Sequence, residues 1–153
     1  MNKFFKYLRI LIIITLTVFI SIFMFKTIRC VKKIEEYNIS YQIISLCICF
    51  IIYLALNIKD LIKRDKINNN TRYNILSCVA LLIISLLFIR ALYDPSFIAN
   101  VKNYKVGRVV NTGKIYYNYF FQYNIMYIES NVIYIDLLLI LLILYRFVNR
   151  KKH

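Results

Sequence analysis

The stretch ISYQIISLCICFIIYLALNI, from Ile39 to Ile58, decides the fold of this chain. It carries no charged side chain, and eleven of its residues are Ile, Leu or Phe. A bilayer's hydrocarbon layer is about 30 Å thick and needs about 20 mostly apolar residues to cross as a helix. At about −0.3 to −0.6 kcal/mol each, these eleven residues contribute roughly −3 to −7 kcal/mol to insertion. The segment is therefore predicted to enter a membrane as a helix.

Three further apolar stretches have a similar length, namely Phe4–Phe25, Tyr73–Tyr93 and Val132–Val148. Backbone amides find no partner in lipid, so only helices or closed barrels can cross a bilayer. The chain is therefore predicted to be an all-α membrane protein of four transmembrane helices, arranged as an up-and-down bundle in a single domain over residues 1–153. The connection over residues 95–129 is the long one.

Local signals support these boundaries. Within the first stretch, an uncharged run from Ile10 to Phe25 follows Lys3, Lys6 and Arg9, as in a secretory signal peptide. No small-residue cleavage site comes after the run, which favours an uncleaved anchor. Asn68–Asn70 offer capping side chains before the third stretch, and Pro95 is expected to stop that helix just beyond its end.

The net charge of +14 suggests nucleic acid as one class of partner, because Lys and Arg neutralise phosphates. The chain is also 61% hydrophobic, and its basic residues flank the apolar stretches. Basic residues in that position set topology and contact anionic headgroups. We therefore expect the lipid bilayer, and no nucleic acid, as a partner. The abundant Ile, Asn, Lys, Tyr and Phe have A/T-rich codons, which indicates a bacterial cell membrane as the location.

Loop charges orient the predicted bundle. With the N-terminus cytoplasmic, twelve basic residues fall on the cytoplasmic side and nine on the other, where they are spread over more residues. Four of the seven acidic residues also fall on the outer side, at Glu35, Glu36, Asp94 and Glu129. The positive-inside tendency therefore predicts that both termini are cytoplasmic.

The third connection has two readings. Val106–Val110 and Ile115–Tyr123 flank an Asn-Thr-Gly-Lys turn and can pair as a β-hairpin, in which Gly113 takes a positive φ. A face through Tyr116, Phe120, Tyr123 and Tyr127 equally fits an interfacial helix or an extension of the fourth helix.

The tyrosines of this connection also have two readings. They can form a belt against lipid headgroups, where ring and hydroxyl find different surroundings. Alternatively, they form a contact surface for another membrane or extracellular protein, for a peptide or for a glycan. The residues of that outer-loop surface are Tyr117, Tyr119, Phe121 and Tyr123.

Few residues suggest catalysis, metal binding or disulfide formation. Cys47 and Cys49 point about 200° apart on a helix, so they cannot share a metal or close a disulfide. Cys78 is expected to lie too far from Cys49 along the bundle, and Cys30 stands alone. His153 is the only histidine. We therefore expect no catalytic residue, no metal site, no cofactor and no enzymatic activity. Hydroxyls such as Thr15, Thr17, Ser45, Ser77 and Ser85 are expected to bond to their own helix backbone.

Arg90 and Asp136 form the most interesting polar pair. Arg90 falls near the outer end of the third predicted helix, and Asp136 within two turns of the start of the fourth. At similar depth they can form an interhelical ion pair. The alternative is that each snorkels to the interface by itself.

Two function classes fit these observations. The first is a non-catalytic membrane protein that acts through contacts, as an accessory subunit or a toxin-immunity-type protein. The alternative is a subunit of a small oligomeric transporter or channel, whose polar groups would line a pathway.

The topology gives a first testable prediction. A reporter protein that is active only in the cytoplasm should be active when it is fused after His153. The reason is that the twelve basic residues on the side of the C-terminus favour a cytoplasmic location for that side. The same reporter inserted between Ile34 and Glu35 should be inactive. An extracytoplasmic tail would overturn the orientation.

Overall fold

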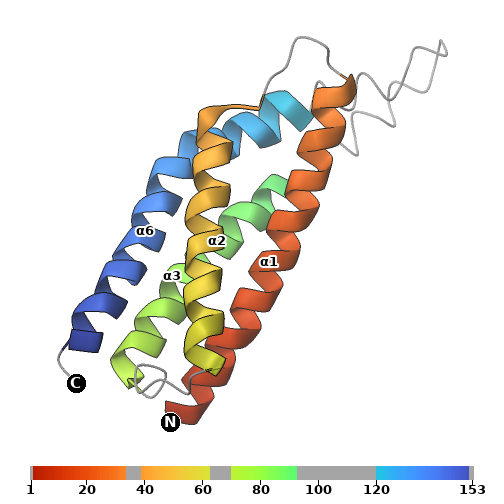
Figure 1. The fold of residues 1–153 in the computed structure, drawn as a ribbon. Helices are drawn as coiled ribbons and strands as arrows, with labels where there is room; N and C mark the ends of the chain where they lie inside the picture. The colour runs from red at the N-terminus through yellow and green to blue at the C-terminus, as the bar shows by residue number, and fades with distance from the viewer. Residues whose placement is uncertain (1, 34–38, 63–69, 93–119, 152–153) are drawn as a thin grey trace, which may run out of the picture.

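Four long helices make up nearly all of the computed structural model of this chain (Figure 1). They are α1 (Asn2–Lys33), α2 (Tyr41–Ile62), α3 (Thr71–Leu92) and α6 (Met126–Lys151), and a π-helix, η3 (Phe120–Ile125), directly precedes α6. The structure describes residues 2–33, 39–62, 70–92 and 120–151. Every secondary-structure element within these ranges is a helix, as the sequence predicts.

Side-chain caps begin two of the helices. The Ile43 amide donates a hydrogen bond to Ser40 Oγ at 3.4 Å, and the Tyr73 amide donates to Asn70 Oδ1 at 3.2 Å. Such caps satisfy amide groups that have no partner in the first turn. The predicted capping role of the Asn68–Asn70 run is thus confirmed at Asn70.

Each long helix exceeds its predicted apolar stretch, and the difference is largest for α1 and α6. The predicted first helix ended at Phe25, but α1 continues to Lys33. The predicted fourth helix began at Val132, but α6 begins at Met126. Hydropathy marks the part of a helix that can lie in lipid, whereas hydrogen bonds within the helix continue through residues such as Lys26 and Arg29.

The predicted hairpin is not confirmed. Phe120–Tyr123, the described part of its second strand, belongs to η3. The first strand and the turn lie outside the described residues. The helical alternative holds from Phe120 onward, because burial there recurs every three or four residues rather than every second one. The buried positions are Ile125, Ile128, Val132, Ile135, Leu139 and Leu142.

The helices alternate in direction, so Asn2 and Lys151 lie at the same end of the bundle (Figure 1). Their packing does not follow chain order. The largest helix contact joins α1 to α3, the next joins α2 to α6, and α3 packs on α6 to join the two pairs. Consecutive helices α1 and α2 make at most a slight contact with each other. The bundle therefore has an open side between α1 and α2.

An apolar core runs through the bundle, and its fully buried members between α1 and α3 lie from the middle toward the end farther from the two chain ends. Leu16 and Phe23 of α1 and Leu81, Ile84 and Phe88 of α3 are all fully buried. The Phe23 and Phe88 rings meet edge to face, with 5.6 Å between their centroids. Aromatic pairs of this geometry add about 0.5–1.5 kcal/mol to the effect of burial.

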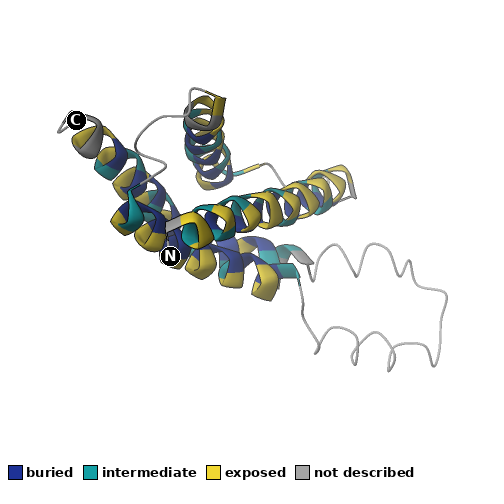
Figure 2. Cartoon of the chain, turned by 90° about the horizontal axis from the view of Figure 1, so that it is seen from below, coloured by how far each residue is buried: buried dark blue, intermediate teal, exposed yellow. Residues whose placement is uncertain are grey.

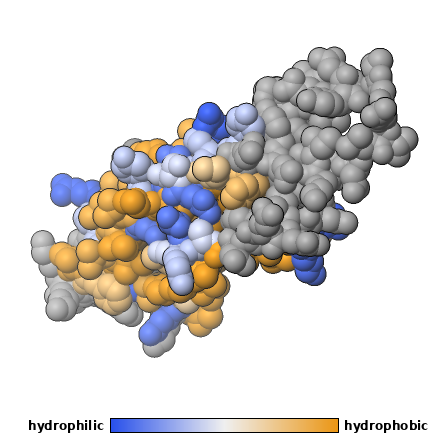
Figure 3. Space-filling view, turned by 90° about the horizontal axis from the view of Figure 1, so that it is seen from above, coloured by the Kyte–Doolittle hydropathy of each residue, from blue (hydrophilic) through white to orange (hydrophobic). Residues whose placement is uncertain are grey.

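The outward faces of the helices are also apolar. Figure 2 shows buried residues on the inner side of each long helix and exposed residues on the outer side, and Figure 3 shows hydrophobic side chains over much of the surface. On α3 the exposed residues include Val79, Leu82, Ile83 and Leu86. By length and composition, all four long helices could cross a membrane.

The aromatic core contact gives a second prediction. Phe88→Ala should destabilise the bundle by about 3–5 kcal/mol, because it leaves a cavity beside Phe23. Leu86→Ala, on the same helix but 64% exposed, should change stability by less than about 0.5 kcal/mol. Equilibrium unfolding in mixed detergent micelles measures both. Equal losses would contradict the observed orientation of α3.

Candidate functional site

A cluster of buried polar side chains lies in the half of the bundle that holds the two chain ends. Arg9 of α1 and Asn57 of α2 are only 1% and 3% exposed, and Tyr53, Tyr73 and Ser77 are also buried. We call these five residues the polar cluster. Ionisable side chains are rarely placed inside an apolar bundle, and a buried one marks a candidate functional site.

Cation–π and stacking contacts connect three helices at this cluster. The guanidinium carbon of Arg9 lies 5.0 Å from the centroid of the Tyr73 ring on α3. The Tyr73 ring stacks on Tyr145 of α6, with 6.0 Å between centroids and 5° between planes. From α2, the Tyr53 hydroxyl lies in electrostatic range of Arg9 and Tyr73. The arginine charge is therefore held against aromatic faces in the interior.

Several polar atoms of the cluster retain hydrogen-bonding capacity. Asn57 donates from Nδ2 to the Tyr53 carbonyl at 2.8 Å, but its Oδ1 has no hydrogen-bond partner among the described residues. The Tyr53 hydroxyl and Ser77 Oγ form no hydrogen bond of ordinary geometry within these ranges either, although Asn57 and Ser77 both lie close to that hydroxyl. A buried polar group without a partner costs about 1–3 kcal/mol. Such groups are suited to bind water or a ligand.

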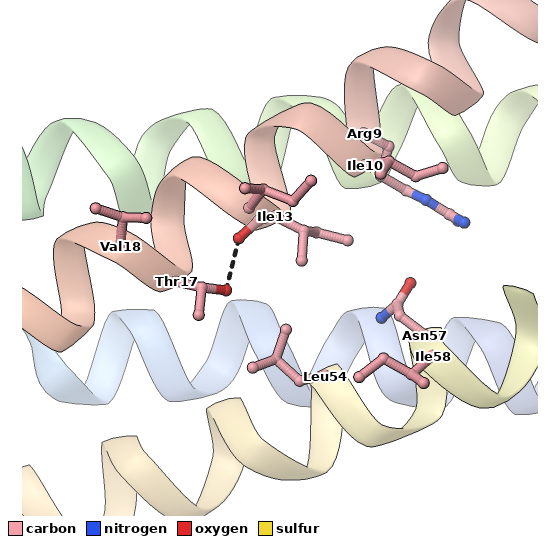
Figure 4. A pocket seen from close by; sticks show the side chains of 9 residues that line it. Arg9, Ile10, Ile13, Thr17, Val18, Leu54, Asn57 and Ile58 are labelled. Carbon is pink, nitrogen blue, oxygen red and sulfur yellow. Dashed lines mark hydrogen bonds between the residues drawn. The ribbon is translucent and has the colours of Figure 1, made fainter.

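A cleft opens beside the cluster, between α1 and α2. Its volume is about 400 Å³, within the usual range for ligand sites. Figure 4 shows Arg9 and Asn57 together at one end of the cleft and Val18 at the other, with Thr17 donating its hydroxyl to the Ile13 carbonyl at 2.7 Å. The remaining wall is apolar and consists of Ile10, Ile13, Ile14, Val18, Leu54 and Ile58.

Asp136 lies deeper than the sequence suggests. Because α6 begins at Met126, Asp136 is ten residues into the helix, about 15 Å from its start and at the middle of the apolar span Tyr123–Val148. Ser45 of α2 donates a hydrogen bond to Asp136 Oδ2 at 2.6 Å. Asp136 Oδ1 is buried and has no hydrogen-bond partner in the part of the chain that the structure describes.

Arg90 has a different neighbour from Asp136. Its guanidinium carbon lies 4.0 Å from the centroid of the Tyr127 ring. Tyr127 precedes Asp136 by nine residues on α6, a distance of about 13 Å along the helix axis. The structure thus places Arg90 and Asp136 at different levels and with different neighbours, and their coupling stays a prediction.

The predicted outer-loop surface is only partly described. Tyr117 and Tyr119 lie outside the described residues. Phe121 packs partly buried against the core, whereas Tyr123 is 55% exposed. Because both belong to η3, they project at helical rather than alternating positions. A contact surface that includes Tyr123 stays a prediction.

The cysteines are all free thiols in this structure. Cys47 Sγ lies 3.6 Å from Met24 Sδ of α1, and Cys78 Sγ lies 3.6 Å from the Phe5 carbonyl oxygen. Both contacts join neighbouring helices. Among the described residues, no three His, Cys, Asp or Glu side chains come together as metal ligands.

The hydroxyls follow the sequence expectation in three of the five named cases. Thr15, Thr17 and Ser85 each donate to the carbonyl four residues earlier in their own helix. Ser45 instead donates to Asp136, and Ser77 Oγ has no partner among the described residues. The prediction is wrong for Ser45 and Ser77, because tertiary packing places both near polar groups of other helices.

Sequence reasoning missed the polar cluster and its cleft. Arg9 was interpreted only as a flanking charge, and Asn57 was not singled out. A signal was present, since an amide side chain within a long apolar run is costly unless it is bonded or functional. Which helix would face Asn57 could not be read from the sequence.

No known protein family matches the chain, and neither a curated protein nor a solved structure shows significant similarity to it.

The Ser45–Asp136 contact gives a third prediction. Ser45→Ala should destabilise the bundle by about 1–3 kcal/mol, because Asp136 Oδ2 then loses its hydroxyl donor while Oδ1 already has no hydrogen-bond partner among the described residues. In an Asp136→Leu background the same change should cost much less, and equilibrium unfolding of the four proteins measures this coupling.

Ser85→Ala is the matched control, since Ser85 is buried but bonds to its own helix. Its effect should be the same with and without Asp136→Leu. A parallel cycle with Arg90→Gln and Asp136→Asn tests the predicted ion pair, and simple additivity there would count against it.

Proposed function

We propose that this chain is a multi-pass integral protein of a bacterial cell membrane, with both termini cytoplasmic. The distribution of side chains on the four long helices carries the proposal: large apolar residues face outward while Arg9, Asn57 and Asn74 are buried. A soluble protein rarely exposes apolar patches larger than a few hundred Å². A helix that is apolar on all sides suits a lipid environment.

Within the membrane, we propose that the protein acts through contacts rather than catalysis, as an accessory subunit or a toxin-immunity-type protein. Its polar cluster lies toward the end that holds the two chain ends, whereas fully buried Leu16, Phe23, Leu81, Ile84 and Phe88 fill the space between α1 and α3 from the middle to the other end. A continuous polar pathway through a single chain is not favoured by this packing. The exposed side chain of Tyr123 lies at the end of the bundle opposite the two chain ends, where a partner outside the cell could reach it.

A second candidate is a subunit of an oligomeric transporter or channel. The observation that favours it is Asp136, an ionisable residue at the middle of its span with one buried oxygen that has no partner among the described residues. Such residues commonly mark ion or proton pathways. In this case Asp136 would line a pathway formed between chains.

A fourth prediction tests membrane insertion and separates these candidates. The chain should stay with membranes after alkaline carbonate washing and leave them only in detergent. A photo-crosslinking amino acid at Tyr117, Tyr119 or Tyr123 should then capture one discrete protein partner in cells. The same label at Leu86, an outward position on α3, should not capture it.

The transporter candidate predicts the opposite pattern. Purified protein in sealed vesicles would conduct ions or protons, and Asp136→Asn would abolish the flux, while changes at Tyr123 would have no effect. A chain that washes off membranes with carbonate would overturn both candidates.

A further inference from the structure

We propose that Asp136 is a proton-binding site within the membrane, where its carboxyl group is held as the neutral acid against Ser45 of α2. The inference rests on the proposed membrane insertion, and it deepens the transporter candidate by naming the proton as the ion that Asp136 binds. Three features support it: the depth of the contact, the lack of an ion pair among the described residues and the small number of donors around the carboxyl group.

The contact between Ser45 and Asp136 lies deep in the apolar part of both helices. On α6, the nearest other charged side chains are seven residues before Asp136 and ten residues after it. In the sequence, Ser45 comes nine residues after Glu36 and fourteen before Lys59. Both residues therefore lie within about 4.5 Å of the middle of these stretches. An aspartate side chain is too short to reach the membrane surface from there, unlike the side chain of a lysine or an arginine.

Within the described ranges, Asp136 forms no ion pair. The ionisable side chains that α3 places against α6 lie at the two ends of α3, where Arg90 covers the Tyr127 ring and Tyr73 stacks on Tyr145. Tyr127 and Tyr145 are each nine residues from Asp136, which corresponds to about 13 Å along the helix. A negative charge on Asp136 would therefore have no cation beside it in the described part of the bundle.

The polar groups near the carboxyl group come from α2. Ser45 Oγ lies 2.6 Å from Asp136 Oδ2, and the Cys49 thiol, a weak donor, lies close to both residues. From η3, which also packs on α6, the titratable Tyr123 is thirteen residues away along the chain. A carboxylate has about four acceptor sites. Asp136 Oδ1 is nevertheless buried without a hydrogen-bond partner among the described residues.

These surroundings favour the neutral acid over the carboxylate. A carboxyl group in water is ionised at neutral pH, but an isolated carboxylate in an apolar medium is so costly that the group takes up a proton instead. Loss of the charge also lowers the cost of the buried Oδ1, since a charged acceptor without a partner costs more than a neutral one. The distance of 2.6 Å suits a short hydrogen bond in either state, so the surroundings decide the state.

The site suits a proton rather than a metal ion. Its oxygens are the two of the Asp136 carboxyl group and the hydroxyl of Ser45. Ca²⁺ takes about six to eight oxygen ligands and Mg²⁺ an octahedral set, so these oxygens are too few for either ion. In the part of the chain that the structure describes, no three His, Cys, Asp or Glu side chains come together as metal ligands. A proton needs only the carboxyl group itself.

The test is infrared spectroscopy of the full chain at neutral pH, in bilayers of an ether-linked phosphatidylcholine that has no carbonyl group of its own. The C=O stretching band of a neutral carboxyl group lies at higher frequency than the bands of a carboxylate. The wild-type chain should show the neutral band, because carboxyl groups in water are ionised at this pH and Asp136 is not. Asp136→Asn should lose the band.

Two matched controls accompany these measurements. Glu129→Gln removes an acidic group from the first turn of the same helix and should leave the band unchanged. Ser45→Ala removes the hydrogen bond to Oδ2 and should move the band to higher frequency. Ser85→Ala should not move it, because Ser85 bonds to its own helix. The wild-type spectrum and the Ser45→Ala shift keep the test decisive if Asp136→Asn does not fold.

Three outcomes would overturn the inference. They are a wild-type chain that shows only carboxylate bands, a neutral band that persists in Asp136→Asn, and a band that Ser45→Ala leaves unshifted. A chain that stays in the membrane but has an ionised Asp136 refutes this inference alone. A carbonate-extractable chain refutes the proposed membrane function itself, so the two failures can be told apart.

Discussion

The structure depends on one constraint, that the backbone amides of long apolar segments find their hydrogen bonds inside their own helices. Once α1, α2, α3 and α6 have met it, their side chains are free to be apolar on every face. Residues such as Leu86 and Leu141 then face outward while Phe23 and Phe88 face inward. Inward and outward positions differ little in hydrophobicity, so packing shape rather than hydrophobicity distinguishes them.

Packing between alternate helices has a direct consequence for the site. Because α1 lies on α3 and α2 lies on α6, the two helices joined by the first connection do not close against each other. The resulting cleft has Arg9 and Asn57 at one end and an apolar wall along the rest of its length. A bundle in which α1 and α2 packed closely would have closed this space.

Polar side chains stabilise this bundle at two levels. Near the chain ends, Arg9, Tyr73 and Tyr145 connect three helices through cation–π and stacking contacts. At the middle of α6, Asp136 is joined to α2 by Ser45. Both arrangements place polar groups where water is scarce, and there an unmatched polar atom is costly. Asn57 Oδ1, Ser77 Oγ, the Tyr53 hydroxyl and Asp136 Oδ1 are buried without a hydrogen-bond partner in the described part of the chain, and each therefore lowers the stability of the bundle.

The sequence by itself determined the helical class, the number of apolar helices and the capping at Asn70, because these follow from hydropathy over about 20 residues and from local side-chain chemistry. It did not determine where α6 begins, because the Tyr-rich segment fits a strand or a helix locally and only burial of Ile125 and Ile128 against other helices favours the helix. Nor did it show that Ser45 meets Asp136 or that Arg9 meets Tyr73. Those contacts depend on which helices pack together, and helices of nearly uniform hydrophobicity carry little information in their sequence about which neighbour they will choose.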